Sequence, residues 1–177
     1  MAETHFRPEP GPALAIDSLE AAASLEEVVS VLRRSARAIV GSDGIAVILR
    51  EGDSAYYAAE DAIEPLWRGR RFRLTECVSG WAMLHGQAAI VPDIEDDPRV
   101  PVAAYRTTSM RSLVVVPIGA PVPVAALGAY WCASVIPDDA TVRRLEALAR
   151  RAAAALARVR RPAEAARSRE PAQPSGR

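Results

Sequence analysis

"CVSGWAMLHGQAAIVPDIEDDPRVPVAAYRTTSMRSLVVVPI", which spans residues 77–118, contains the signals that decide the fold. Its first part predicts a short helix that runs to about His85, with Thr75 or Ser79 as the N-terminal cap. Two apolar runs rich in β-branched residues predict strands, because such side chains favour extended backbone. Between them, acidic residues and prolines predict a loop with one short helix.

The flanking segments add more strands and a helix at each end of the chain. Ser24 and Glu27 form the S-x-x-E pattern of a capping box, which starts a helix that ends at Gly41. A last amphipathic helix is predicted over residues 138–161. Apolar or alternating runs predict the strands, over residues 45–50, 55–59, 88–91, 113–117 and 124–132, with a short extended stretch at 72–74. This order predicts an α+β fold, an antiparallel sheet of five or six strands with the terminal helices on one face. Short helices and loops form a pocket on the other face.

The composition excludes several classes of protein. Half of the residues are apolar, yet no apolar run approaches the roughly 18 residues of a membrane span. No basic and apolar leader opens the chain, so we expect a cytoplasmic protein without membrane contact. All 22 basic residues are arginine, which excludes Schiff-base and P-loop lysines. The two cysteines, Cys77 and Cys132, form neither a zinc motif nor a disulfide framework.

Charge is balanced over the whole chain but not along it. Residues 138–177 contain ten arginines and five acidic residues, a net charge of +5, so residues 1–137 carry −5. A basic end can attract nucleic acid, but a solvated helix and tail explains the same pattern. We expect the solvated helix and no nucleic-acid binding.

The quoted stretch, followed by GAYW at residues 128–131 and the closing helix, resembles a GAF domain, a fold related to PAS domains. The segment EDAIEPLWRGRRF, residues 60–72, is similar to GAF domains that accompany bacterial sensor histidine kinases. The resemblance places the domain at residues 17–161. It leaves residues 1–16 as a flexible N-terminal tail and residues 162–177 as a disordered C-terminal tail. Neither tail has room for an output domain, so we expect a stand-alone domain.

The resemblance implies a sensory and regulatory role in bacterial two-component signal transduction. We expect a non-enzymatic module that binds a small molecule or senses redox state and signals through its terminal helices to a partner such as a histidine kinase. Apolar residues of the last helix follow 3-4-3-4 spacing, a short seam made of Leu145, Leu148, Ala152, Ala155 and Val159. This helix must cover the sheet, pair with another helix, or both, and we expect a homodimer through the terminal helices. A dimerisation module with an empty or collapsed pocket is the alternative.

The resemblance also directs attention to one group of side chains at the pocket. Arg106 or Arg111 can clamp an anionic ligand with its planar guanidinium. Trp81 is either an aromatic pocket wall or part of the core. The ligand-binding residues expected from this reading are Cys77, Trp81, Asp93, Tyr105, Arg106, Met110 and Tyr130.

An acidic cluster follows the strand at 88–91. Asp93, Glu95, Asp96 and Asp97 lack the spacing of an EF-hand loop, and Arg99 offers a salt bridge beside them. We therefore expect turn hydrogen bonds from the aspartates and no metal site.

Cys77 supports an enzymatic alternative. It lies in the first turn of the predicted helix, where the positive end of the helix dipole lowers the pKa of a thiol. GAF-type methionine sulfoxide reductases use cysteines on this fold, and Cys77 would be the catalytic residue of such an enzyme. Their cysteine pattern is not evident here, so we expect no enzyme.

Other branches of the GAF family bind cofactors or cyclic nucleotides, and this chain lacks the residues that each kind of binding requires. Alignment on LVVVPI places the bilin-binding cysteine of photoreceptor domains near Val100, so covalent bilin is not expected. Haem needs an axial histidine, and the chain has His5 in a tail and His85 at a helix end. The cyclic-nucleotide branch carries an Asn- and Lys-containing signature, and this chain has neither residue. We expect no cofactor, although the resemblance allows an unknown small-molecule ligand.

Overall fold

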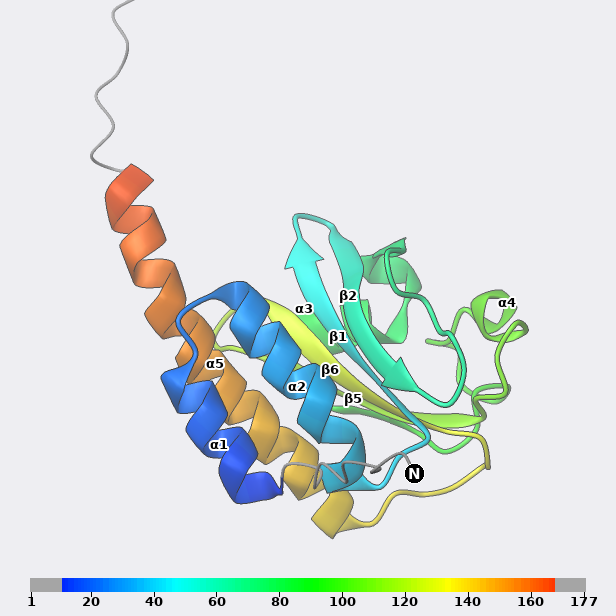
Figure 1. Cartoon of the computed structure of the whole chain (residues 1–177). Coiled ribbons are helices and arrows are strands. Elements are labelled where there is room, and N and C mark those ends of the chain that lie inside the picture. Colours follow the sequence, from blue (N-terminus) through cyan, green and yellow to red (C-terminus); the bar gives the residue numbers. More distant parts are fainter. Residues whose placement is uncertain (1–10, 168–177) are drawn as a thin grey trace, which may run out of the picture.

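The computed structural model describes residues 11–167, with side chains as far as Arg161, and shows one antiparallel sheet with helices on both faces (Figure 1). The order of the strands across the sheet is β3-β2-β1-β6-β5-β4. The strands are β1 (Gly44–Glu51), β2 (Ser54–Ala62), β3 (Arg71–Arg73), β4 (Ala89–Val91), β5 (Ser112–Ile118) and β6 (Ala125–Trp131). The helices are α1 (Pro12–Ala21), α2 (Leu25–Val40), the 3-10 turn η1 (Leu74–Glu76), α3 (Val78–His85), α4 (Val102–Tyr105) and α5 (Asp139–Arg167).

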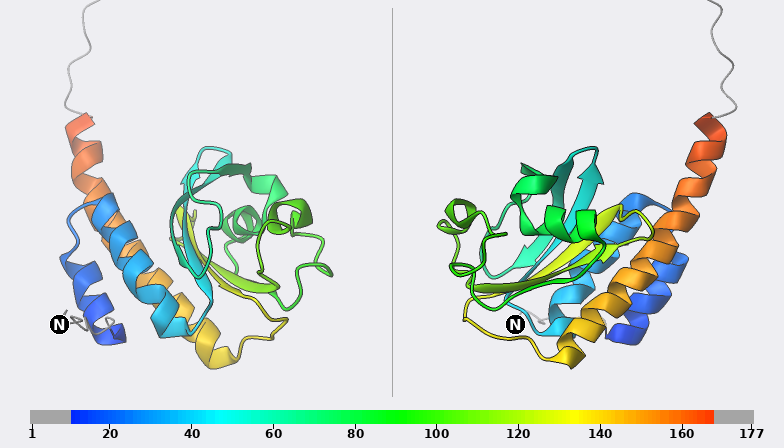
Figure 2. Two further views of the ribbon diagram at one scale, coloured as in Figure 1. Left: turned by 45° about the vertical axis from the view of Figure 1, so that its right-hand side comes forward. Right: turned by 180° about the vertical axis from the view of Figure 1, so that it is seen from behind.

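Helices α1, α2 and α5 form one layer, which we call the helix layer, on one face of the sheet (Figure 2). The opposite face, which we call the pocket side, is covered by η1, α3, α4 and the loops around them. Each face has its own hydrophobic core, so β5 is buried on both sides and has an apolar run instead of alternation. The six strands and the two layers confirm the predicted α+β fold. None of the helices in the described part of the chain is long and apolar enough to cross a membrane.

Helix α2 starts and stops where the sequence predicts. The Ser24 hydroxyl accepts a hydrogen bond from the Glu27 backbone N–H at 3.1 Å, and the Glu27 carboxylate accepts one from the Ala23 N–H at 2.8 Å. Gly41 ends the helix with a φ of 65°, a left-handed conformation that glycine adopts without strain. The Ser24 cap is therefore confirmed, while the reciprocal bond to Glu27 comes from the residue before the cap instead of from the Ser24 N–H.

The apolar stripe of α5 covers the sheet, which is one of the uses that the sequence left open for it. Helices α2 and α5 pack on the sheet, and α1 packs on both helices. Leu145, Leu148, Ala152 and Ala155 all belong to the core between α5 and the sheet. Apolar residues at this helical spacing can pack against a sheet or against a second helix, and here they pack against the sheet.

Both predicted tails overlap helices. Residues 12–16 belong to α1, where Pro12 occupies the first turn, which tolerates its missing N–H, and Ala15 is buried. Helix α5 continues through Pro162 to Arg167, because the loss of one backbone hydrogen bond does not end a helix rich in alanine and arginine. The rest of the predicted tails lies outside the described residues.

Candidate functional site

An aromatic cluster fills the pocket side of the sheet. Trp67, from the loop between β2 and β3, lies at its centre and is 2% exposed. Its ring centroid is 4.6 Å from that of Tyr105, 5.4 Å from Tyr130 and 5.6 Å from Tyr57, in tilted or edge-on contacts. The Trp67 indole Nε1–H donates to the carbonyl oxygen of Ala104 at 3.0 Å, which satisfies the polar end of a buried side chain.

The loop that carries Trp67 is held by two carboxylates. The Glu60 carboxylate accepts hydrogen bonds from the backbone N–H groups of Leu66, Trp67 and Arg68 at 3.1, 2.9 and 2.8 Å. The Glu64 carboxylate accepts hydrogen bonds from the backbone N–H and the hydroxyl of Ser109, in the segment after α4. These bonds tie the loop to β2 and to the segment after α4, and so they position the Trp67 indole.

Little space remains beside the aromatic cluster. The cavity there has a volume of about 10 Å³, which is about the room that one water molecule needs. Pockets for small organic ligands measure roughly 300–1,000 Å³. The side chains that line this cavity are Tyr57, Trp67, Phe72, Cys77, Pro101, Ala104 and Tyr105. In this conformation the pocket side does not accommodate a small organic molecule.

Cys77 caps α3, a role that the sequence assigns to Thr75 or Ser79. Its sulfur accepts a hydrogen bond from the Gly80 backbone N–H at 3.3 Å and lies 3.4 Å from the Ser79 hydroxyl. The side chain is 4% exposed. Burial raises the pKa of the Cys77 thiol, and the hydrogen bonds from Ser79 and Gly80 lower it by less. The predicted lowering of this pKa by the helix dipole is wrong, because desolvation of the thiolate outweighs it.

Three buried tyrosines surround the thiol. The Tyr57 hydroxyl and the Ser79 hydroxyl form a hydrogen bond of 3.0 Å. Burial raises the pKa of Tyr57, Tyr105 and Tyr130, so all three are neutral phenols at physiological pH. Within the described residues, the buried hydroxyl of Tyr130 has no hydrogen-bond partner. The side chains that line the cavity in the described part of the chain are therefore neutral.

Four of the residues predicted for the pocket meet in this core and three do not. Cys77, Tyr105, Met110 and Tyr130 all belong to the buried cluster on the pocket side. Trp81 packs at the edge of that cluster, outside the cavity. Its ring stacks on His85 with centroids 4.4 Å apart, and the Arg99 guanidinium lies 4.6 Å from its ring centroid.

Of the remaining two predicted residues, Asp93 is half-buried and Arg106 is exposed, and neither lines the cavity. The Asp93 carboxylate accepts hydrogen bonds from the Glu95 N–H at 3.0 Å and the Ser134 hydroxyl at 2.8 Å, and these bonds lower its pKa. The Asp97 carboxylate accepts one from the Arg99 backbone N–H at 2.9 Å. The predicted turn hydrogen bonds of the acidic cluster are therefore confirmed for two of its aspartates.

Sequence reasoning missed Tyr57, Trp67 and Ser79. Tyr57 points inward in the alternating burial pattern of β2, so the period of two contained a usable signal. Trp67 lies in a stretch without periodicity. A large aromatic residue between Pro65 and Gly69 was the sole indication in the sequence that this loop has a buried side chain.

Comparisons with known proteins agree with this architecture. A family model described as GAF domain matches residues 22–157. Among curated proteins, no match to the sequence is found. The GAF domain of a phosphoenolpyruvate-protein phosphotransferase from Coxiella burnetii has a TM-score of 0.74 at 16% identity, over 88% of this chain and 94% of that one.

Two further solved structures illustrate how widely this fold is used. A free methionine-R-sulfoxide reductase from Neisseria meningitidis, in complex with its substrate, has a TM-score of 0.70 at 18% identity, over 85% of this chain and 89% of that one. A far-red cyanobacteriochrome photoreceptor has a TM-score of 0.67 at 11% identity, over 81% and 91% of the two chains. At these identities the likeness shows the fold alone. Since the family match spans most of the chain and the sheet and its two layers agree with it, the chain belongs to the GAF domain family.

Proposed function

We propose that this GAF domain is a non-catalytic regulatory module that acts through protein contacts of its helix layer, with its pocket side closed by its own side chains. GAF domains are sensory and regulatory modules, and three modes were open for this one: a bound ligand, a reactive thiol, or protein contacts alone. The observation that favours protein contacts is the position of Trp67. Its buried indole fills the pocket side and donates a hydrogen bond to the Ala104 carbonyl oxygen.

A ligand would first have to displace this indole. Moving one tryptophan side chain into water exposes roughly 200 Å² of buried surface, which costs about 5 kcal/mol at ~25 cal/mol per Å². An open state at that free energy has a population of about 1 in 5,000, and the apparent affinity of any ligand falls by the same factor. Tight binding of a small molecule on the pocket side is therefore disfavoured.

The thiols do not favour an enzyme either. The sulfur of Cys77 is buried and serves as the cap of α3, and burial raises its pKa. Burial also raises the pKa of the Cys132 thiol, whose sulfur lies 4.0 Å from that of Met110. Nucleophilic cysteines have lowered pKa values and accessible sulfurs, which neither residue combines.

Native mass spectrometry of the protein purified from its own host tests this proposal. We expect the mass of the bare polypeptide, and no thermal stabilisation by amino acids, cyclic nucleotides, methionine sulfoxide, haem or biliverdin. A defined additional mass, or a shift in melting temperature that saturates with one of these compounds, would contradict the proposal. The resemblance to domains that accompany histidine kinases makes such a kinase the first partner to test by pull-down.

A further inference from the structure

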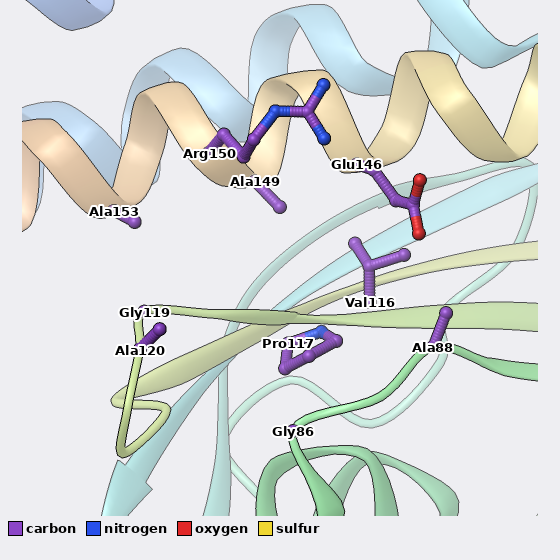
Figure 3. Close-up of a pocket in the computed structure, with 10 residues that line it drawn as sticks. All are labelled: Gly86, Ala88, Val116, Pro117, Gly119, Ala120, Glu146, Ala149, Arg150 and Ala153. Atoms are coloured by element: carbon purple, nitrogen blue, oxygen red, sulfur yellow. The ribbon is translucent and has the colours of Figure 1, made fainter.

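Two hollows of the helix layer differ in the side chains that line them. The larger, of about 360 Å³, lies between α5 and the end of β5, where Val116, Ala149 and Ala153 line it with small apolar groups (Figure 3). The smaller, of about 250 Å³, lies at the end of α2 that leads into β1, on the side that faces β2 (Figure 1). We call this second hollow the arginine pocket, and its lining residues are Arg34, Arg37, Ala38, Gly41, Ser42 and Asp61.

The sequence of α2 leaves room for the arginine pocket. Arg34 and Ala38 are four residues apart, as are Arg37 and Gly41, so all four residues lie along one side of the helix. Ala38 is exposed, and a Cβ added to Gly41 would meet nothing within 4 Å. The pocket therefore depends on two small residues that follow two long, charged ones.

Most of the hydrogen-bonding capacity of this pocket is unused. Within the described part of the chain, no hydrogen bond or ion pair reaches the side chain of Arg34. The Arg37 Nη1 lies 3.4 Å from the Asp61 Oδ1, and the two side chains are 32% and 41% exposed. Exposed pairs of this kind contribute little to stability, so Arg37 can exchange Asp61 for a stronger anion. The buried hydroxyl of Ser42 also has no hydrogen-bond partner among residues 11–161.

The charges around the pocket favour an anion. The C-terminal end of a helix is equivalent to about half a negative charge on its carbonyl oxygens. Here the Arg37 carbonyl oxygen already accepts hydrogen bonds from the N–H groups of Gly41 and Ser42, at 2.9 and 3.3 Å. The positive charges of Arg34 and Arg37 outweigh the half charge of the helix end and the Asp61 carboxylate together.

We propose that the arginine pocket binds a phosphorylated side chain of a partner protein. The inference deepens the proposed function, on which it rests, by naming what the helix layer recognises. A phosphate monoester presents three strong acceptor oxygens, and a planar guanidinium group pairs with two of them at once. Arg34 and Arg37 supply these donors, and rotation of the Ser42 side chain about its Cα–Cβ bond brings a hydroxyl donor to the same group.

The volume and the existing ion pair narrow the choice of ligand. A pocket of about 250 Å³ is smaller than the roughly 300–1,000 Å³ of pockets for small organic molecules, and so it suits a single side chain. A carboxylate from a partner would only repeat the contact that Asp61 already makes with Arg37. A phosphate group carries up to two negative charges at neutral pH, so it competes with Asp61 more effectively than a carboxylate does.

Titration of the full chain with a short peptide, followed by NMR, tests the site. The probe is the blocked tripeptide alanine–phosphoserine–alanine, in which phosphoserine is a chemically stable phosphate monoester. We expect saturable shifts of the backbone amide signals of Gly41 and Ser42 and of the Nε–H signals of Arg34 and Arg37. The same peptide with glutamate in place of phosphoserine should bind about tenfold more weakly, because it has less charge and fewer acceptor oxygens. Inorganic phosphate should also bind more weakly than the phosphopeptide, because it fills less of the pocket.

Substitutions in the lining identify the contacts. Arg34→Gln and Arg37→Gln should each raise the Kd of the phosphopeptide about tenfold, because each removes a charged double donor. Ala38→Leu should abolish binding, because the larger side chain occupies the pocket while its exposed helical position tolerates leucine. Asp61→Asn should lower the Kd about threefold, because it removes the carboxylate that competes for Arg37.

Arg33→Gln is the matched control. Arg33 precedes Arg34 on the same helix, but its Nε donates to the Glu60 carbonyl oxygen at 3.1 Å and the residue does not line the pocket. The substitution removes the same charge, so a general electrostatic attraction would weaken equally in Arg33→Gln and Arg34→Gln. Binding in the pocket predicts a large change for Arg34→Gln alone.

Four results would overturn the inference: no saturable shift at millimolar phosphopeptide, equal affinity for the glutamate peptide, equal affinity for inorganic phosphate, or equal effects of Arg33→Gln and Arg34→Gln. The amide spectrum of each variant shows whether it is folded before its Kd is interpreted. The proposed function fails on a different observation, a bound small molecule in the native mass spectrum, so the two failures are distinguishable.

Discussion

Replacement of Trp67 by alanine tests the closed pocket side directly. The substitution removes a side chain that is 2% exposed, three aromatic contacts and the hydrogen bond to Ala104. Large-to-small changes of this kind cost about 3–5 kcal/mol, so we expect a loss near 4 kcal/mol. For a domain of this size that corresponds to a fall in melting temperature of roughly 8–16 °C, measured by calorimetry or circular dichroism.

The cavity created by Trp67→Ala should bind indole. At a tenfold excess over its Kd, indole should return about 1.4 kcal/mol of the lost stability, while the wild-type protein should show no shift. Trp81→Ala is the matched control, because that indole is half-buried at the edge of the core and its loss leaves no enclosed space. Stabilisation of the wild-type chain by indole, or a cost below about 1 kcal/mol for Trp67→Ala, would refute the idea that Trp67 closes the site.

Three further predictions concern local structure. Gly80→Ala should prevent native folding, because the new Cβ would lie 1.9 Å from a backbone oxygen of η1. Gly11→Ala is the control and should fold normally, because nothing lies within 4 Å of a Cβ added there. Equal melting temperatures of the two variants would contradict the predicted clash. Hydrogen bonds from Arg99 lower the pKa of Asp97. They contribute about 1–2 kcal/mol to the free energy of unfolding at any pH above the unfolded pKa of about 3.9. This contribution is lost as the pH falls through the folded pKa. The destabilisation by Asp97→Asn should therefore shrink in acid, and a pH-independent difference in urea titrations would exclude this ion pair as its source. A thiol reagent should modify Cys77 about a hundredfold more slowly in the native state than in denaturant, and equal rates would show that the thiol is accessible.

Much of the fold was predictable because its signals are local. The capping box at Ser24 and Glu27 and the apolar run of β5 each identify an element without help from the rest of the chain. The sequence allows an earlier helical turn from Asp17 but misses the start of α1 at Pro12. The prolines before it are typical of loops, and Pro12 occupies the first helical turn, where it is tolerated.

The site was less predictable because its geometry depends on distant contacts. The position of Trp67 depends on the Glu60 carboxylate, which accepts hydrogen bonds from N–H groups six to eight residues ahead of it. Which tyrosine of β2 points inward depends on the pairing of β1 with β2, which shifts register between Val47 and Ile48. The pKa of the Cys77 thiol depends on burial, which a helical position does not reveal.

The short outer strands of the sheet limit how this domain can associate. β3 and β4 each contain three residues, and β3 carries arginines at both of its ends. At the other margin, the Arg99 guanidinium donates to the Ile90 carbonyl oxygen at 3.2 Å, and Pro92 follows β4 directly. A foreign strand would find few free backbone groups to pair with, so this sequence, rich in β-branched residues, offers little template for fibril growth. We therefore expect contacts with other chains to involve the helices and not an added strand.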